Sequence, residues 1–206
     1  MMGRFNGLAS VYHPTSMSPA TSLPYTGNPD ADRLLATDAL ALLIGFALDQ
    51  QVTVQKAFSG PWELQRRLGH LDAGRIAATD PAELDRVFRE RPALHRFPGS
   101  MAGKVQALCA AIERDYGGDA SRIWREATSG ADLQARLLAL PGFGEMKART
   151  VIAVLGKRFD VRPPGMDEVM PAHHTLGDVD SPEALAAYQA GKRAYKASMR
   201  AQGKRV

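Results

Sequence analysis

The sequence predicts an all-α protein built as two small helical lobes around a cleft. Apolar residues recur at three- and four-residue intervals along most of the chain, and helix caps and breakers separate these runs. We find no sustained alternation of apolar and polar residues that would indicate a sheet. A length of 206 residues with 45% hydrophobic content is sufficient for a single core shared by two lobes.

Three segments are expected along the chain. Residues 1–28 hold many turn formers and few periodic apolar positions, so we expect a flexible arm there. Residues 29–180 are predicted to form the helical domain. Residues 181–206 are predicted to form a basic helix that packs back on it.

The first helices are predicted from their caps. The helical part begins near Asp30, and Thr37-Asp38 offers an N-cap to a mostly buried run. Gly60-Pro61 is expected to open the next helix, which Gly69 ends. Asp80-Pro81-Ala82-Glu83 has the pattern of a capping box at the start of another.

The later helices are predicted from the same kinds of helix cap and breaker. Ser181-Pro182-Glu183 is expected to open the last, basic helix. Before it we expect a long helix capped by Ser100, a short one from Ser121, and two that run from Asp132 to Leu140 and from Glu145 to Gly156.

Composition excludes several classes of protein. No run approaches the ~18 apolar residues of a membrane span, and no signal peptide is evident at the N-terminus. Cys109 is the single cysteine, which excludes an internal disulfide, a four-cysteine iron–sulfur cluster and a cysteine-rich zinc site. His173-His174 lacks a third ligand at metal spacing. We expect no metal or other cofactor, and a monomer in the cytoplasm, associated with the nucleoid.

The positive charge is concentrated at one end of the chain. The net charge is +4, and the residues from Ala184 onward carry no acid, which leaves −2 for the rest. A basic terminal helix suits a polyanion, although a solvated tail would have the same composition. The six basic residues of this segment are Lys192, Arg193, Lys196, Arg200, Lys204 and Arg205.

The most informative segment is Leu140-Pro141-Gly142-Phe143-Gly144, a very short connection between two predicted helices. The proline ends the first helix, and the two glycines allow backbone angles closed to other residues. Phe143 is expected to point back and wedge the helices together. The amide groups then face outward at the positive end of the next helix, which is a phosphate site. Lys147, on its first turn, adds a charged contact.

This segment resembles the hairpin of the helix-hairpin-helix DNA glycosylase superfamily, which includes endonuclease III and 3-methyladenine glycosylase. Two further segments resemble that superfamily, Leu42 to Thr53 and Gly103 to Leu108, so the similarity covers about residues 30–170. The likeness is greatest to a compact, uncharacterised bacterial branch. The partner that this resemblance implies is double-stranded DNA with a damaged or mismatched base.

The resemblance also implies roles for individual residues. A glycosylase extrudes its target nucleotide, and in the superfamily a residue of the early turn fills the gap. Gln51 or Gln50 falls at that place, although either could simply cap the preceding helix. Bifunctional members carry a lysine nucleophile two residues after the second hairpin glycine. Met146 stands there, and Lys147 is one step further on the helix, so strand cleavage is not expected.

The superfamily's essential aspartate lies about 18–20 residues beyond the Met146 position. The first aspartate in this region is Asp167, which we predict as the carboxylate that stabilises the cationic sugar. An ordinary N-cap would also suit it, and Asp160 and Asp178 are the alternatives. The sequence therefore predicts a base-excision repair protein, a monofunctional DNA glycosylase that hydrolyses the N-glycosidic bond. The alternative is a DNA-binding protein that kept the hairpin without catalysis.

Overall fold

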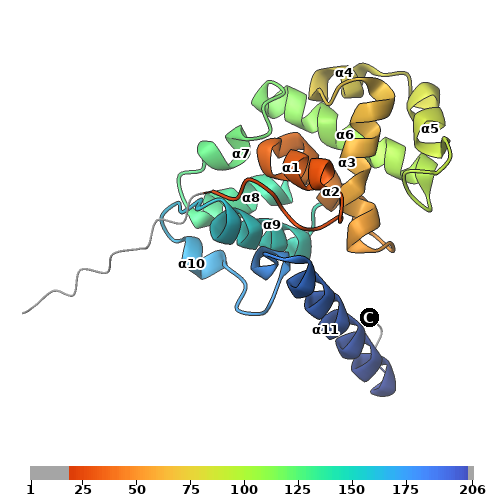
Figure 1. Cartoon of the computed structure of the whole chain (residues 1–206). Helices are drawn as coiled ribbons and strands as arrows, with labels where there is room; N and C mark the ends of the chain where they lie inside the picture. The colour runs from red at the N-terminus through yellow and green to blue at the C-terminus, as the bar shows by residue number, and fades with distance from the viewer. Residues whose placement is uncertain (1–18, 204–206) are drawn as a thin grey trace, which may run out of the picture.

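The computed structural model describes residues 19–203, which contain eleven α-helices, one 3₁₀ helix and no strand (Figure 1). The all-α prediction is confirmed. The helices are α1 Pro29–Thr37, α2 Ala39–Leu48, α3 Val54–Leu68, α4 Ala73–Ala78, α5 Pro81–Arg89, α6 Pro98–Tyr116, α7 Arg122–Arg125, α8 Gly130–Leu138, α9 Glu145–Arg158, α10 Met166–Val169, the 3₁₀ helix η1 Leu176–Asp178, and α11 Pro182–Ala201.

Helix α2 is the central element of the fold. Asp38 caps it as expected, its carboxylate accepting the amide of Ala41 at 2.9 Å. Every residue from Leu40 to Leu48 is buried, because the helix is apolar on all sides and α1, α3 and α6 pack around it. Each large apolar side chain buried there contributes about 1.5–3 kcal/mol.

Helix α3 differs from its prediction. It begins at Val54, where Thr53 accepts the amide of Lys56 at 3.2 Å, so Gly60 and Pro61 lie inside it. The structure explains the glycine: a Cβ at Gly60 would collide with the side chain of Leu48 on α2. The Gly-Pro pair therefore marks the close contact of two helices and not a helix start.

The helices form two packed groups that share one core. In the first, α1 to α3 and α4 to α6 pack on one another, with α2 and α6 in contact. In the second, α8, α10 and η1 pack against α9, and α11 packs against η1. Buried apolar residues of both groups belong to one continuous cluster.

The chain before α1 is packed more tightly than expected. Leu23 and Tyr25 are fully buried, and the Tyr25 hydroxyl donates to the carbonyl of Leu176 at 2.7 Å. The Asp32 carboxylate accepts the amide of Thr26 at 2.8 Å. These ties hold the last part of the predicted arm against the domain. Residues 1–18 lie outside the described part of the chain.

Helix α11 packs back on the domain only near its start. Leu185 is buried, and Gln189 exchanges hydrogen bonds with Gln55 of α3. Figure 1 shows the rest of α11 extending beyond the other helices. Lys204 and Arg205 are not among the described residues. Within residues 19–203, no helix is both long and apolar enough to cross a membrane.

Candidate nucleic-acid interface

The residues Leu140–Gly144 form a tight turn between α8 and α9, called the 140–144 turn below. Leu140 and Phe143 are buried, and the Phe143 amide donates to the Leu140 carbonyl at 3.1 Å. Phe143 thus lies in the core, as a wedge between the helices requires. Gly142 has φ +80°, a left-handed conformation that L side chains adopt only at a cost, so the turn itself explains this glycine.

Gly144 has no such explanation. Its backbone angles are φ −99° and ψ 177°, which any residue adopts. A Cβ built on Gly144 would meet no atom within 4 Å. As the residue that caps α9, it also lacks the side-chain hydrogen bond that Ser, Thr, Asp or Asn would supply. The fold therefore does not demand glycine at this position, whereas the close approach of a partner would.

The start of α9 presents unpaired backbone donors. The amides of Gly142 and Gly144 donate to no acceptor within residues 19–203. The first amides of α9 have no partner inside the helix either, and they lie at its positive end. Glu145 is the one acid of this first turn, and Gln134 of α8 donates to its carboxylate at 3.1 Å. This geometry suits an anion at the 140–144 turn.

Met146 and Lys147 lie in different environments. Met146 is 82% exposed, so an apolar side chain lies in solvent on the first turn of α9. The Lys147 Nζ is buried and has no hydrogen-bond partner in the described chain; it lies 5.2 Å from the centre of the Phe143 ring. Lys147 was expected to contact a phosphate, but the structure places its ammonium group beneath the turn.

The charges of Lys147 and Asp49 each act on the pKa of the other. Burial lowers the pKa of Lys147 to about 8, Asp49 opposes that shift, and Lys104 adds to it. Burial raises the pKa of Asp49, against the opposing effect of Lys192, Lys147 and Lys196. Asp49 ends α2, and a carboxylate at a helix C-terminus is unfavourable. The positive charges of the three lysines oppose that cost, although burial outweighs them.

The structure separates the two glutamines of the early turn. Gln50 is held in place: its side chain accepts from Lys104 at 2.7 Å and donates to the Ala47 carbonyl at 3.2 Å. Its own carbonyl lies 3.0 Å from the ring nitrogen Nε2 of His95. Gln51 is exposed and has φ +57°, an unusual conformation for a residue with a side chain. Of the two, Gln51 is the one whose side chain is free to reach a partner.

The sequence alone did not reveal two parts of this cluster. Lys104 lies in a segment that was singled out from the sequence, but its hydrogen bond to Gln50 could not be predicted, because the two residues are 54 positions apart. Tyr188 is half-buried, the Asp49 carboxylate and burial raise its pKa to about 12, and the Lys192 Nζ lies 5.3 Å from its ring centre. Both contacts depend on tertiary packing, although the lysines of α11 were visible as a charge excess.

Asp167 lies apart from the 140–144 turn. It is exposed on α10, whose first residue, Met166, packs near Gly156 in the last turn of α9. The axis of α9 rises about 15 Å between Met146 and Gly156. The structure therefore does not bring Asp167 to the turn.

The alternative aspartates are also engaged elsewhere. Asp178 forms an ion pair of 2.6 Å with Lys157 and accepts the amide of Thr175 at 2.8 Å. Asp160 is exposed, and its nearest cation is Arg162 at 3.4 Å. Neither lies near the start of α9. The carboxylate close to Lys147 is Asp49, which the sequence did not single out.

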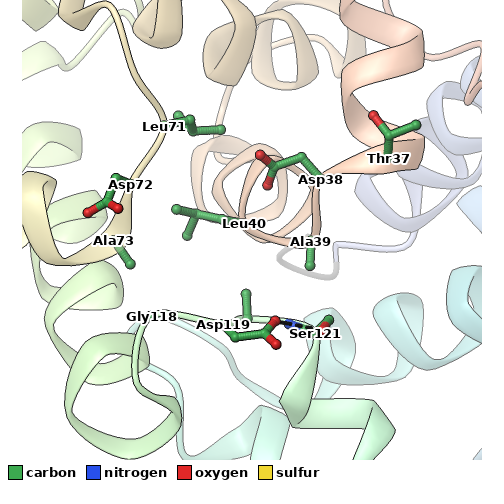
Figure 2. Close-up of a pocket in the computed structure, with 11 residues that line it drawn as sticks. Thr37, Asp38, Ala39, Leu40, Leu71, Asp72, Ala73, Gly118, Asp119 and Ser121 are labelled. Carbon is green, nitrogen blue, oxygen red and sulfur yellow. Dashed lines mark hydrogen bonds between the residues drawn. The ribbon is translucent and has the colours of Figure 1, made fainter.

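A surface pocket of about 330 Å³ lies elsewhere, between the start of α2, the start of α4 and the loop before α7. Figure 2 shows the carboxylates of Asp38, Asp72 and Asp119 around it. Asp72 accepts the amide of Arg75 at 2.7 Å and Asp119 that of Ser121 at 2.9 Å, so each caps local structure, as Asp38 does. The pocket is negatively charged and suits a polyanion poorly.

His173 and His174 are exposed, and no cluster of three metal-ligating side chains occurs in the described residues. The structural features that point to a ligand therefore gather at the 140–144 turn, the Asp49–Gln51 loop and the base of α11. Comparisons of the chain with protein-family models, with curated proteins and with solved structures found no match.

Proposed function

We propose that this protein binds double-stranded DNA through the 140–144 turn, in the manner of a base-excision repair protein. The observation that carries the proposal is Gly144, a glycine that the fold does not require at a turn with unpaired amides. A phosphate oxygen can approach such a surface closely and accept from two or more amides. The resemblance to the helix-hairpin-helix superfamily supports the same ligand.

Contacts of this kind position the duplex and carry no sequence information. We therefore expect the protein to bind duplexes of different sequence with similar affinity. The exposed Gln51 and Met146 are the side chains available to contact bases or sugars near the bound phosphates.

The proposal is tested by fluorescence anisotropy with a labelled duplex over a series of salt concentrations. The affinity should fall steeply with salt, with a slope of about −0.9 for each phosphate contact. Absence of binding at low salt, or binding that does not change with salt, would contradict the proposal. Either of these outcomes would favour a third class of function, a helical interaction protein without nucleic acid.

A second candidate function is removal of a damaged or mismatched base, and one arrangement favours it. Asp49 and Gln51 belong to the same turn, Asp49 lies near Lys147 at the start of α9, and Gln51 is exposed in a strained conformation. A carboxylate can stabilise the cationic sugar that forms as the base leaves. Since Met146 offers no amine and the Lys147 amine is buried, this enzyme would hydrolyse the N-glycosidic bond and release the base without cutting the strand.

Base removal is tested with duplexes that carry uracil, oxidised, alkylated or mismatched bases, with alkali to reveal abasic sites. The assay compares Asp49→Asn with Asp167→Asn. Loss of product in the Asp49 variant alone would assign the carboxylate to Asp49, and loss in the Asp167 variant alone would restore the assignment made from sequence. If no duplex gives product, the protein binds DNA without removing a base.

A further inference from the structure

The second half of α11 stands free of the rest of the described molecule. Leu185, Tyr188 and Gln189 hold the start of the helix, whereas every residue from Ala190 to Ser198 is exposed. The twelve residues from Ala190 to Ala201 correspond to about 18 Å of helix. Figure 1 shows this part of α11 beyond the other helices.

The exposed half has two unlike faces. Successive residues turn by about 100°, so Lys192, Lys196 and Arg200, four residues apart, advance by only about 40° at each step. Arg193 follows Lys192 by about 100°, which places the four cations within an arc of about 100°. The opposite side carries small residues, namely Ala187, Ala190, Ala194, Ala197 and Ala201.

The cationic face continues the side of the helix that packs on the domain. Leu185 lies seven residues before Lys192, and Gln189 lies seven before Lys196; positions seven apart differ by only about 20° around a helix. The basic stripe therefore faces the angle between α11 and the domain. The Asp49 carboxylate, at the base of that angle, is near Lys147, Lys192 and Lys196.

Four cations on one face are costly for an isolated helix. Like charges four residues apart destabilise a helix by about 0.2–0.5 kcal/mol for each pair. In residues 19–203 none of the four forms an ion pair. The charges of Lys192 and Lys196 lower the pKa of Asp49, against the larger effect of burial. Four cations on one face without an ion pair in the described residues fit an anionic partner.

We propose that the basic face of α11 is a second DNA-binding element, which holds the phosphate backbone next to the segment bound by the 140–144 turn. The inference rests on the proposed function and extends it, because the bound duplex then lies in the angle between α11 and the start of α9. Gln189 of α11 is hydrogen-bonded to Gln55, which follows the Asp49–Gln51 loop closely in the chain. The charges of Lys147 and Lys192 both act on Asp49 in that loop, so the two elements belong to one region of the surface. The 18 Å of free helix add about five base pairs to the site at 3.4 Å per pair.

The test measures duplex affinity over a salt series for three proteins. The first is the wild type, and the second is the triple variant Arg193→Gln, Lys196→Gln, Arg200→Gln, whose substitutions lie on the free helix. The third is a control that removes the same charge from exposed sites on α1, α5 and α7: Arg33→Gln, Arg86→Gln, Arg125→Gln. The α11 variant should bind on the order of tenfold more weakly at ~0.1 M salt, with a slope smaller by about 2 to 3. The control should match the wild type.

Two results would overturn the inference while the proposed function stands: an α11 variant with the slope of the wild type, or a control that loses as much affinity as the α11 variant. Absence of DNA binding by the wild type would instead contradict the proposed function, and the inference with it. Vesicles rich in anionic lipid provide a further arm. Binding to them that depends on α11, with an unchanged DNA slope, would assign the face to a membrane surface.

Discussion

The acidic pocket and the 140–144 turn are two polar regions of one small helical protein, and they differ in how far the fold accounts for their residues. At the pocket, Asp38, Asp72 and Asp119 each accept a backbone amide and so complete a helix start or a turn. At the turn, Gly144 serves no backbone need and the Lys147 amine has no hydrogen bond.

The contrast rests on the hydrogen bonds of each region and not on its concavity. The pocket is a hollow between helix caps and turns, and each of its three carboxylates accepts a backbone amide of the local structure. The 140–144 turn has unpaired backbone donors. The Asp49–Gln51 loop adds Gln51, whose φ is positive, and Asp49, a carboxylate at the C-terminal end of α2, where a negative charge is unfavourable. Groups that folding leaves unsatisfied are the ones available to a ligand.

The largest expected effect is on DNA binding by Gly144→Asp. Aspartate is a better N-cap than glycine, so the melting temperature should stay the same or rise. Its carboxylate would meet the approaching phosphate and take the amides it needs, so affinity should fall about 10- to 100-fold, the loss of one or two charged hydrogen bonds. Ala82→Asp, in the first turn of α5, adds the same charge at another helix start and should bind as the wild type does.

The second prediction concerns the buried amine. Replacing Lys147 by Met removes the cost of holding an ammonium group away from water, so the variant should melt at a higher temperature at pH 7. The folded-state pKa, about 8, lies below the ordinary value of 10.5. Between pH values of about 8 and 10.5 the unfolded chain binds more protons at Lys147 than the folded chain does, so the free energy of unfolding of the wild type increases as the pH rises.

The measurement is the difference in melting temperature between Lys147→Met and the wild type from pH 7 to pH 10.5. The difference should shrink as the pH rises, by about 2–4 °C for each kcal/mol recovered. A variant that is less stable than the wild type at pH 7 would show that Lys147 and Asp49 stabilise the fold as an ion pair.

A smaller effect is expected at the pocket. Asp38→Ala removes the cap of α2 and should lower the free energy of unfolding by about 1 kcal/mol, which corresponds to about 2–4 °C. Affinity for the duplex should not change, because this carboxylate serves the helix. A loss of binding without a loss of stability would reverse the comparison and make the pocket the ligand site.

The smallest effect distinguishes the two glutamines. Gln51→Gly relieves the positive φ, so it should leave the melting temperature unchanged or raise it slightly. Gln50→Gly removes the hydrogen bonds to Lys104 and Ala47 and should lower it. Thermal denaturation of both variants checks this; equal losses would mean that Gln51 has a structural role as well.

Local patterns predicted most of the helices and the short turn between α8 and α9. Asp38, Asp80 and Ser181 cap helices where the sequence places them. The misjudged Gly60-Pro61 pair shows the limit, since its meaning depends on Leu48 of another helix. Tyr25 was missed for the same reason: its partners, Phe58 and Leu176, are distant in the chain.

The same limit applies to the candidate site, whose local turn was predicted and whose tertiary contacts were not. The turn was visible in Leu140 to Gly144 because it is a local motif. The burial of the Lys147 amine and the effect of the Asp49 charge on its pKa depend on tertiary packing, which no local pattern encodes. Likewise, Asp167 was predicted from its separation from Met146 along the sequence. Its distance in space from the 140–144 turn depends on the path of the chain after α9, which that separation does not encode.

The most direct test of the central claim is an NMR titration of the ¹⁵N-labelled protein with a short duplex. We predict that the amide signals of Gly142, Gly144 and Glu145 shift most as DNA is added, and that Gly118, Asp119 and Ser121 at the pocket stay in place. Shifts that gather at the pocket, with the 140–144 turn unchanged, would contradict the account.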